Sequence, residues 1–304
     1  MLVAVFDIGG TNIKYGIGDS HGHILAEDVT PTGASKGGAV LVEKIEHLTK
    51  QLQQQWPITG VAISTAGSID SAAGKVIYAT QTIPGYTGMN VKKLLETRLQ
   101  LPVEVENDVH CGALGELWKG VASDSQQLLF LTIGTGIGGS LALHGQIHKG
   151  ASHLASAIGH MNLYPNGRLC SCGQKGCFEQ YASVSRLEQK IQEIQPHQQV
   201  PAFMESVKRG DEESVNLFHE WLNDLVIGLQ SLIYVWNPDS VVIGGGISAQ
   251  GKWLEQEIES ALFKNLLEPF KEKLVIRLAK NGNRSNLLGA IKNYELQQVR
   301  REIR

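Results

Sequence analysis

The feature that most constrains the fold is a strand–glycine turn–strand pattern that occurs twice, about 125 residues apart. The apolar segment 2–6 leads into Asp7-Ile8-Gly9-Gly10-Thr11-Asn12 and then into a stretch of alternating polarity. The apolar segment 128–133 likewise leads into a glycine-rich run, 134–139, and then into a second alternating stretch. Each pattern predicts a β-hairpin. The repeat predicts two related α/β domains that face each other across a cleft.

The length of 304 residues favours about two domains. We expect an N-terminal α/β domain over residues 1–118 and a larger C-terminal α/β domain over residues 119–288, because a helical pattern ends near residue 118. A last helix over about 289–304 is expected to pack back on the first domain. The glutamine-rich stretch 189–200 is expected to be a solvated loop between helices.

The composition excludes several classes of protein. The net charge of -3 argues against a nucleic-acid binder that relies on a basic face. No apolar run approaches the roughly 20 residues of a membrane-spanning helix, and the first residues lack the basic and small-residue features of a signal peptide. We therefore expect a cytoplasmic protein with no nucleic-acid or membrane partner.

The first glycine turn suits phosphate binding. Glycines let backbone N–H groups approach phosphate oxygens, and a threonine adds a hydroxyl group. The candidate phosphate-binding residues are Asp7, Gly9, Gly10, Thr11 and Asn12. Asp7 could hold Mg²⁺ through water, since Mg²⁺ prefers oxygen ligands and keeps several waters. The alternative is a tight hairpin with a turn-capping aspartate.

The second glycine turn matches the dinucleotide fingerprint G-x-G-x-x-G, but that fingerprint requires a helix directly after the glycines. Here a strand is expected instead, and no acidic residue follows at a suitable strand end. We interpret the turn as a second phosphate-binding element. A later glycine run follows the strand 241–243 and could lie against an adenosine. The candidate residues are Thr132, Gly134, Thr135, Gly136, Gly244, Gly245 and Gly246.

Glu106-Asn107-Asp108 follows the predicted strand 103–105 and precedes a helical stretch. A carboxylate at the carboxyl end of a strand is well placed to accept a proton from a hydroxyl group, which suits Asp108. The alternative for Asp108 is a helix cap. For His110-Cys111 we expect an exposed histidine and a buried thiol, and not a cysteine nucleophile.

His160, Cys170, Cys172 and Cys177 are separated by ten, two and five residues. Three thiolates and one imidazole make a closed tetrahedral set that is typical of structural zinc. Three clustered cysteines would leave one unpaired if they formed a disulfide. The zinc would not perform chemistry, because four protein ligands leave no open position. Its expected role is to fix the loop that carries His160 and Glu179.

Together these motifs, in this order, resemble the ROK (repressor, open reading frame, kinase) family of bacterial sugar kinases, with the block Cys170-Ser171-Cys172-Gly173-Gln174-Lys175-Gly176-Cys177-Phe178-Glu179 as the most specific match. The resemblance implies an actin-like ATPase fold of two ribonuclease-H-like domains. It implies ATP-dependent phosphoryl transfer, with Mg²⁺, to a sugar hydroxyl, usually the 6-hydroxyl of a hexose. Family members often form homodimers. We expect no helix-turn-helix extension, because the first strand begins at Leu2.

The resemblance also implies roles for individual residues. Asp108 would be the catalytic base, and the two glycine turns would bind the ATP phosphates. The zinc ligands would be His160, Cys170, Cys172 and Cys177. The sugar contacts would be Asn107, Asp108, His160 and Glu179.

One departure from the family pattern bears on the substrate. The family usually has Glu-x-Gly-His around the zinc histidine, with the glutamate on sugar hydroxyls near C1 and C2, whereas this chain has Ala157-Ile158-Gly159-His160 after Ser156. Loss of the carboxylate should weaken glucose binding by roughly 1.5–3 kcal/mol and make room for a substituent. N-acetylmannosamine is therefore the expected substrate. The alternatives are a glucokinase, a β-glucoside kinase, or a non-catalytic sugar-responsive binding protein.

Overall fold

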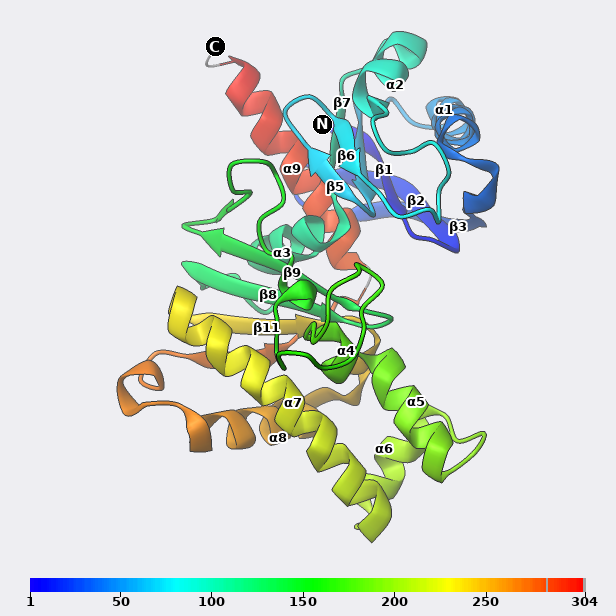
Figure 1. The fold of residues 1–304 in the computed structure, drawn as a ribbon. Helices are drawn as coiled ribbons and strands as arrows, with labels where there is room; N and C mark the ends of the chain where they lie inside the picture. The colour runs from blue at the N-terminus through cyan, green and yellow to red at the C-terminus, as the bar shows by residue number, and fades with distance from the viewer. Residues whose placement is uncertain (283, 303–304) are drawn as a thin grey trace. The chain divides into compact units, whose positions relative to one another are not determined.

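The chain forms two five-stranded mixed sheets with the same strand order, one in each of two units (Figure 1). The strand order is β3-β2-β1-β4-β7 in the first sheet and β10-β9-β8-β11-β12 in the second. In each sheet three antiparallel strands are followed by two strands that run parallel to the third. The bounds are β1 Leu2–Ile8, β2 Asn12–Asp19, β3 Ile24–Pro31, β4 Gly60–Thr65, β7 Val103–Asn107, β8 Gln127–Ile133, β9 Ile137–Leu143, β10 Gln146–Ile147, β11 Ser240–Gly244 and β12 Val275–Leu278.

The structure, a computed structural model, describes residues 1–282 and 284–302. It divides into two compact units. Unit 1 comprises 1–123, 149–155 and 283–304, and unit 2 comprises 124–148 and 156–282. The sequence-based division into residues 1–118 and 119–288 stays a prediction. Among the described residues, no helix is long and apolar enough to cross a membrane.

Alternating side chains in unit 1 give its sheet two covered faces. On β1, Ala4, Phe6 and Ile8 belong to a core that also includes α1 (Gly38–Gln53) and α2 (Val91–Leu99). Val3 and Val5 point to the opposite face, as the period of two requires, and contact the core of α3 (Asp108–Lys119) and α9 (Arg284–Glu302). A small two-stranded ribbon, β5 (Ser68–Asp70) and β6 (Lys75–Tyr78), completes unit 1.

Helices α3 and α9 approach each other closely, and α9, drawn in red in Figure 1, also contacts β1, β4 and β7. The crossing requires glycine, because a Cβ atom at Gly289 would lie 1.7 Å from the carbonyl oxygen of Cys111. The C-terminal helix therefore belongs to the core of the unit that the N-terminal strands build.

The core of unit 2 lies between its sheet and a set of helices, of which the longest is α7 (Glu212–Trp236). Trp221, Leu225 and Leu229 on α7 are buried at helical spacing. The other helices are α4 Glu179–Ala182, α5 Val184–Ile194, α6 Val200–Lys208 and α8 Gly251–Asn265. The prediction of a loop at 189–200 is wrong for residues 189–194, because α5 continues to Ile194 with Leu187 and Ile191 buried.

Candidate active site

The carboxyl ends of β1, β4 and β7 meet at one edge of the first sheet, since these strands are parallel. Asp7, Ser64 and Glu106 lie opposite one another in register. The Oδ1 atom of Asp7 accepts hydrogen bonds from Ser64 Oγ (2.8 Å) and from Asn286 Nδ2 (3.1 Å). Burial raises the pKa of Asp7, although both hydrogen bonds act in the opposite direction. The carboxylate is thus fixed in place at the sheet edge.

The first glycine turn joins β1 to β2, and the predicted hairpin is confirmed. The N–H group of Gly9 donates to the carbonyl oxygen of Asn12 (3.0 Å), and the Thr32 hydroxyl donates to the carbonyl oxygen of Gly9 (2.7 Å). Gly10, Thr11 and Asn12 are exposed. The turn is therefore held at its base, while its tip is accessible to a ligand.

Asp108 is the first residue of α3, and Asn107 is the N-cap of this helix. The side-chain oxygen of Asn107 accepts the N–H group of His110 (3.0 Å), so the cap is Asn107 and the alternative reading of Asp108 as the cap is wrong. Asn107 Nδ2 donates to the carbonyl oxygen of Gly67 (2.9 Å) and to Asp108 Oδ1 (2.8 Å). The N–H group of Val109 also donates to Asp108 Oδ1 (2.9 Å).

Burial raises the pKa of Asp108 to about 6, and the negative charge of Asp7 adds to the rise. A carboxyl group with this pKa is ionised at neutral pH and still basic enough to accept a proton in a transition state. Its position and its pKa both suit a general base.

Glu106 is fully buried and has three donors around its carboxylate. Oε1 accepts the N–H group of Asn107 (2.9 Å) and lies 3.1 Å from His110 Nδ1, and Oε2 lies 2.5 Å from Lys149 Nζ. Burial alone would raise the pKa of Glu106, but the His110 hydrogen bond and the Lys149 charge lower it to about 2. The expectation that His110 is exposed is wrong, because its ring is buried against Glu106.

In unit 2, the second glycine turn joins β8 to β9, and the predicted hairpin is again confirmed. The N–H group of Gly134 donates to the carbonyl oxygen of Gly136 (3.0 Å), and the N–H group of Val184 donates to the carbonyl oxygen of Gly134 (2.9 Å). An antiparallel strand follows the glycines, so the helix that dinucleotide binding requires is not here. Thr135 is exposed at the tip, and Thr132 is half-buried.

The third glycine run follows β11 and lies beside this turn. Gly245 has a φ of 84°, and a Cβ atom there would lie 2.4 Å from the carbonyl oxygen of Ile133. Only glycine allows this backbone conformation at so short a distance. The structure thus brings Gly244–Gly246 to the end of β8, next to Gly134–Gly136.

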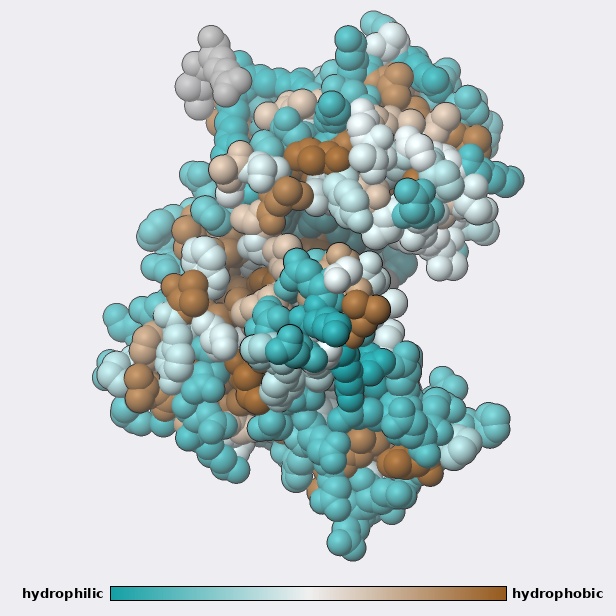
Figure 2. Space-filling view, in the orientation of Figure 1, coloured by the Kyte–Doolittle hydropathy of each residue, from teal (hydrophilic) through white to brown (hydrophobic). Residues whose placement is uncertain are grey.

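The four predicted zinc ligands lie together, with their ligand atoms within 4.8 Å of one another. Cys172 Sγ and Cys177 Sγ are 3.6 Å apart, and Cys170 Sγ is 3.8 Å from His160 Nδ1. Tetrahedral zinc with Zn–S bonds of about 2.3 Å requires sulfur–sulfur distances of about 3.8 Å. The donor set and its spacing therefore fit structural zinc. Figure 2 shows a hydrophilic surface over this part of unit 2, where residues 171–175 are exposed.

Glu179 begins α4 and lies between the cysteine cluster and the second glycine turn. Its Oε1 atom is 3.1 Å from Cys170 Sγ, and its Oε2 atom would be 2.7 Å from a Cβ atom at Gly136.

Ala157 is exposed and precedes the short 3₁₀ helix Ile158–His160. Ser156 has a left-handed φ of 66°, a conformation that glycine adopts at lower cost.

A sequence profile of the ROK family matches residues 3–294. The chain belongs to the ROK family. An uncharacterised protein of Clostridium perfringens is 36% identical and aligns over 97% of this chain and 98% of its own. A β-glucoside kinase of Listeria monocytogenes is 29% identical over 99% of this chain and 100% of its own.

Solved structures agree with this assignment. A ROK glucokinase of Streptomyces griseus in complex with glucose and AMPPNP gives a TM-score of 0.82 at 27% identity, over 96% of this chain and 98% of its own. A Listeria monocytogenes protein described as a candidate N-acetylmannosamine kinase gives 0.87 at 27% identity, over 98% and 100%. These matches confirm the predicted actin-like ATPase fold and the predicted enzyme class, an ATP-dependent carbohydrate kinase.

Several residues that shape the site escaped sequence reasoning. Ser64 and Asn286 hold Asp7, and Lys149 pairs with Glu106. No local motif marks any of them. The only usable signal was the alignment of parallel strand ends, which would have placed Ser64 beside Asp7 once the strand order was known.

Proposed function

We propose that the protein transfers the γ-phosphoryl group of ATP to the 6-hydroxyl of a hexose or N-acetylhexosamine, with N-acetylmannosamine as the preferred acceptor. The observation that carries the proposal is Asp108, a carboxylate with a pKa of about 6 at the carboxyl edge of a sheet. Asn107 and Val109 orient its Oδ1 atom by hydrogen bonds. Asp108 would accept the proton of the attacking hydroxyl as the phosphoryl group moves in line.

The phosphates of ATP are assigned to the two glycine turns. In unit 1 the exposed backbone of Gly10–Asn12 offers N–H groups, and Asp7 would hold Mg²⁺ of the substrate through water. In unit 2 the turn Gly134–Gly136 and the hydroxyl groups of Thr132 and Thr135 would bind phosphate oxygens. Gly244–Gly246 would lie against the adenosine. Because phosphoryl transfer has a loose transition state, the contribution of these residues is positioning and charge stabilisation.

The sugar contacts are assigned to Asn107, Asp108, His160 and Glu179. Zinc, bound by His160 and the three cysteines, would cross-link the loop that carries two of these residues. Glu179 lies close to Cys170, so a rigid metal centre would also fix the direction of the Glu179 carboxylate.

Ala157 supports an acceptor with a substituent near C1 or C2. The position is exposed, and the carboxylate that family members usually place there is absent. Glucose should therefore bind less well by roughly 1.5–3 kcal/mol, which is about 10- to 150-fold. The same argument leaves a β-glucoside as the second candidate acceptor, since a glycoside also carries a substituent at C1.

An assay of ADP release from Mg-ATP tests the proposal against N-acetylmannosamine, N-acetylglucosamine, glucose, mannose, fructose and cellobiose. We expect kcat/KM for N-acetylmannosamine to exceed that for glucose at least tenfold. The variant Ala157→Glu restores the carboxylate and should shift the preference toward glucose. Preferred turnover of glucose by the natural protein would overturn the substrate assignment. Sugar binding without ADP release would overturn the kinase proposal in favour of a sugar-responsive binding protein.

A further inference from the structure

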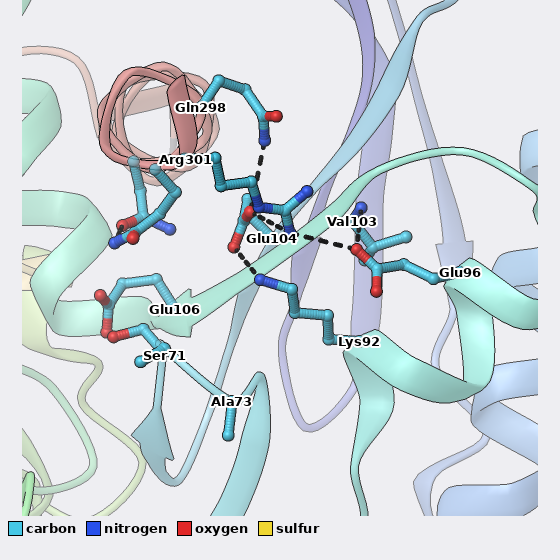
Figure 3. A network of polar contacts seen from close by, with 12 residues as sticks. Ser71, Ala73, Lys92, Glu96, Val103, Glu104, Glu106, Gln298 and Arg301 are labelled. Carbon is cyan, nitrogen blue, oxygen red and sulfur yellow. Dashed lines mark hydrogen bonds and ion pairs between the residues drawn. The ribbon is translucent and has the colours of Figure 1, made fainter. Parts of the chain in front are cut away.

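Two buried glutamates project from β7 and are two residues apart, so they lie on the same face of the sheet. Glu104 and Glu106 each have a side chain that is fully buried. Each is paired with a lysine, because a buried carboxylate without a countercharge would be very costly. Figure 3 shows Glu104 between Lys92 of α2 and the side chains of Gln298 and Arg301 of α9.

The partner of Glu106 comes from elsewhere in the chain. Lys149 belongs to the segment 149–155, which is part of unit 1 although the residues before and after it belong to unit 2. Its Nζ atom donates to Glu106 Oε2 (2.5 Å) and also to the Ser71 hydroxyl. Ser71 follows β5, and Figure 3 shows it beside Glu106. A second contact of the segment lies nearby, between His153 Nε2 and Asp70 Oδ1 (3.7 Å).

The two ion pairs differ in what the carboxylate does next. The carboxylate of Glu104 contacts Lys92, Gln298 and Arg301, and none of these three is a candidate site residue. The carboxylate of Glu106 accepts the backbone N–H group of Asn107 (2.9 Å), and the Asn107 side chain in turn donates to Asp108 Oδ1 (2.8 Å). The Glu106 side chain therefore fixes the N–H group of Asn107, and the side chain of Asn107 contacts the proposed base.

We propose that Lys149 is a positioning residue for the phosphoryl transfer, because it holds Glu106 against the Asn107 amide and thereby orients Asp108. This inference rests on the proposed function. It assigns a part in the reaction to a residue in a segment that precedes the zinc loop and contains none of the predicted site residues. Lys149 touches neither the phosphate turns nor Asp108 in the contacts described, so its action passes through Glu106 and Asn107.

The Lys92–Glu104 pair supplies a matched control. Both lysines are largely buried, with 12% of the Lys92 side chain and 21% of the Lys149 side chain exposed. The single variant Lys149→Met leaves a buried charge on Glu106 and is expected to lower the melting temperature. The double variants Glu106→Gln/Lys149→Met and Glu104→Gln/Lys92→Met remove both charges of one pair, which buried pairs commonly tolerate.

The test compares kcat and KM of the two double variants with those of the natural protein, using the best sugar from the panel. We expect Glu106→Gln/Lys149→Met to lower kcat about 10- to 100-fold with little change in KM for ATP, because a small displacement of a catalytic group has a large effect on rate. Glu104→Gln/Lys92→Met should keep kcat within about twofold. Lys149→Arg, which keeps the charge, should recover most of the loss.

The proposal is overturned if both double variants keep the natural kcat, or if both lose it equally. Circular dichroism and melting temperature identify a variant that has failed to fold. If the Glu106→Gln/Lys149→Met protein fails to fold, the milder variant Lys149→Gln decides, and a natural kcat in a folded Lys149→Gln sample overturns the proposal. If the natural protein releases no ADP with any sugar, the proposed function fails instead. The failure of the proposed function is thus distinguishable from a failure of this inference.

Discussion

The two sheets have the same strand order, yet their carboxyl edges carry different chemistry. The edge in unit 1 presents carboxylates: Asp7 on β1, Glu106 on β7 and Asp108 directly after it. The corresponding edge in unit 2 presents a hydroxyl group and glycines: Thr132 on β8, the turn after it, and Gly244–Gly246 after β11. Thr132 is the next-to-last residue of β8 before its hairpin turn, as Asp7 is the next-to-last residue of β1.

The same strand order can thus carry two kinds of candidate site, because different residues hold the two edges in place. Buried carboxylates need donors, and unit 1 supplies Ser64, Asn286, His110 and Lys149. Glycine turns need close backbone approaches, and unit 2 supplies one at Gly245. We therefore propose that the proton chemistry lies in unit 1, and that unit 2 contributes a phosphate-binding turn without carboxylates and a loop held by zinc.

The strongest test of this comparison removes the proposed base. Asp108→Asn should lower kcat by about 10²- to 10⁴-fold, measured by ADP release at saturating sugar and ATP.

The same variant also changes the stability of the protein. Because the pKa of Asp108 is raised to about 6 in the folded state, the ionised carboxylate destabilises the fold above pH 6. This cost disappears below pH 4, where the group is protonated in both the folded and the unfolded state. Asp108→Asn should therefore melt a few degrees higher than the natural protein at pH 8, and not at pH 4.

A suitable control for that variant is Asp28→Asn. Asp28 is an exposed residue on β3, and its carboxylate accepts a hydrogen bond from the Tyr15 hydroxyl. It should keep full turnover. Near-natural activity in a folded Asp108→Asn sample would remove Asp108 as the base, and with it the assignment of proton chemistry to unit 1.

The second test isolates the proposed zinc site of unit 2. Cys172→Ala should reduce bound zinc from about one per chain to near zero and lower Tm by about 5–10 °C, since metal binding stabilises the folded loop. Zinc is measured by mass spectrometry of the purified protein. The matched control is Cys111→Ala, which removes the buried cysteine of unit 1. Equal zinc loss in both variants would contradict the four-ligand assignment.

The third test uses pH. Asp108 must be ionised to accept a proton, and burial together with the Asp7 charge raises its pKa to about 6. We expect kcat/KM to be level above this pH and to fall about tenfold per unit below it. Stopped assays between pH 5 and 8 give the profile. A profile that stays level down to pH 5 would contradict the assignment, and any residual activity of Asp108→Asn should lack this acidic limb.

The smallest expected effect concerns the equivalence of Asp7 and Thr132. Thr132→Val removes one hydroxyl group and should raise KM for ATP about 3- to 10-fold, the worth of one neutral hydrogen bond. Asp7→Asn should instead lower kcat by a larger factor and change its dependence on Mg²⁺ concentration. Initial rates over a matrix of ATP and Mg²⁺ concentrations separate the two. The same response in both variants would mean that the two edges are not specialised as described.

Much of this fold could be predicted from the sequence, because its signals are local. The alternating pattern around the glycines predicted both hairpins, and the spacing of His160 and the three cysteines predicted that these four side chains lie together. The support residues were hidden, since they reach Asp7 and Glu106 from 57, 279 and 43 positions away. His110 was misjudged for a different reason: its partner Glu106 lies only four residues earlier, but the sequence does not show that both side chains are buried.

The position of α9 has a consequence for how the protein is made. The strands of unit 1 precede unit 2 in the chain, yet the core of unit 1 is completed by α9, which follows unit 2. Asn286, on that helix, also supplies a donor to Asp7. During synthesis the sheet of unit 1 must therefore wait, with one apolar face uncovered, while all of unit 2 is translated. A unit whose translation begins before that of unit 2 is thus completed after it.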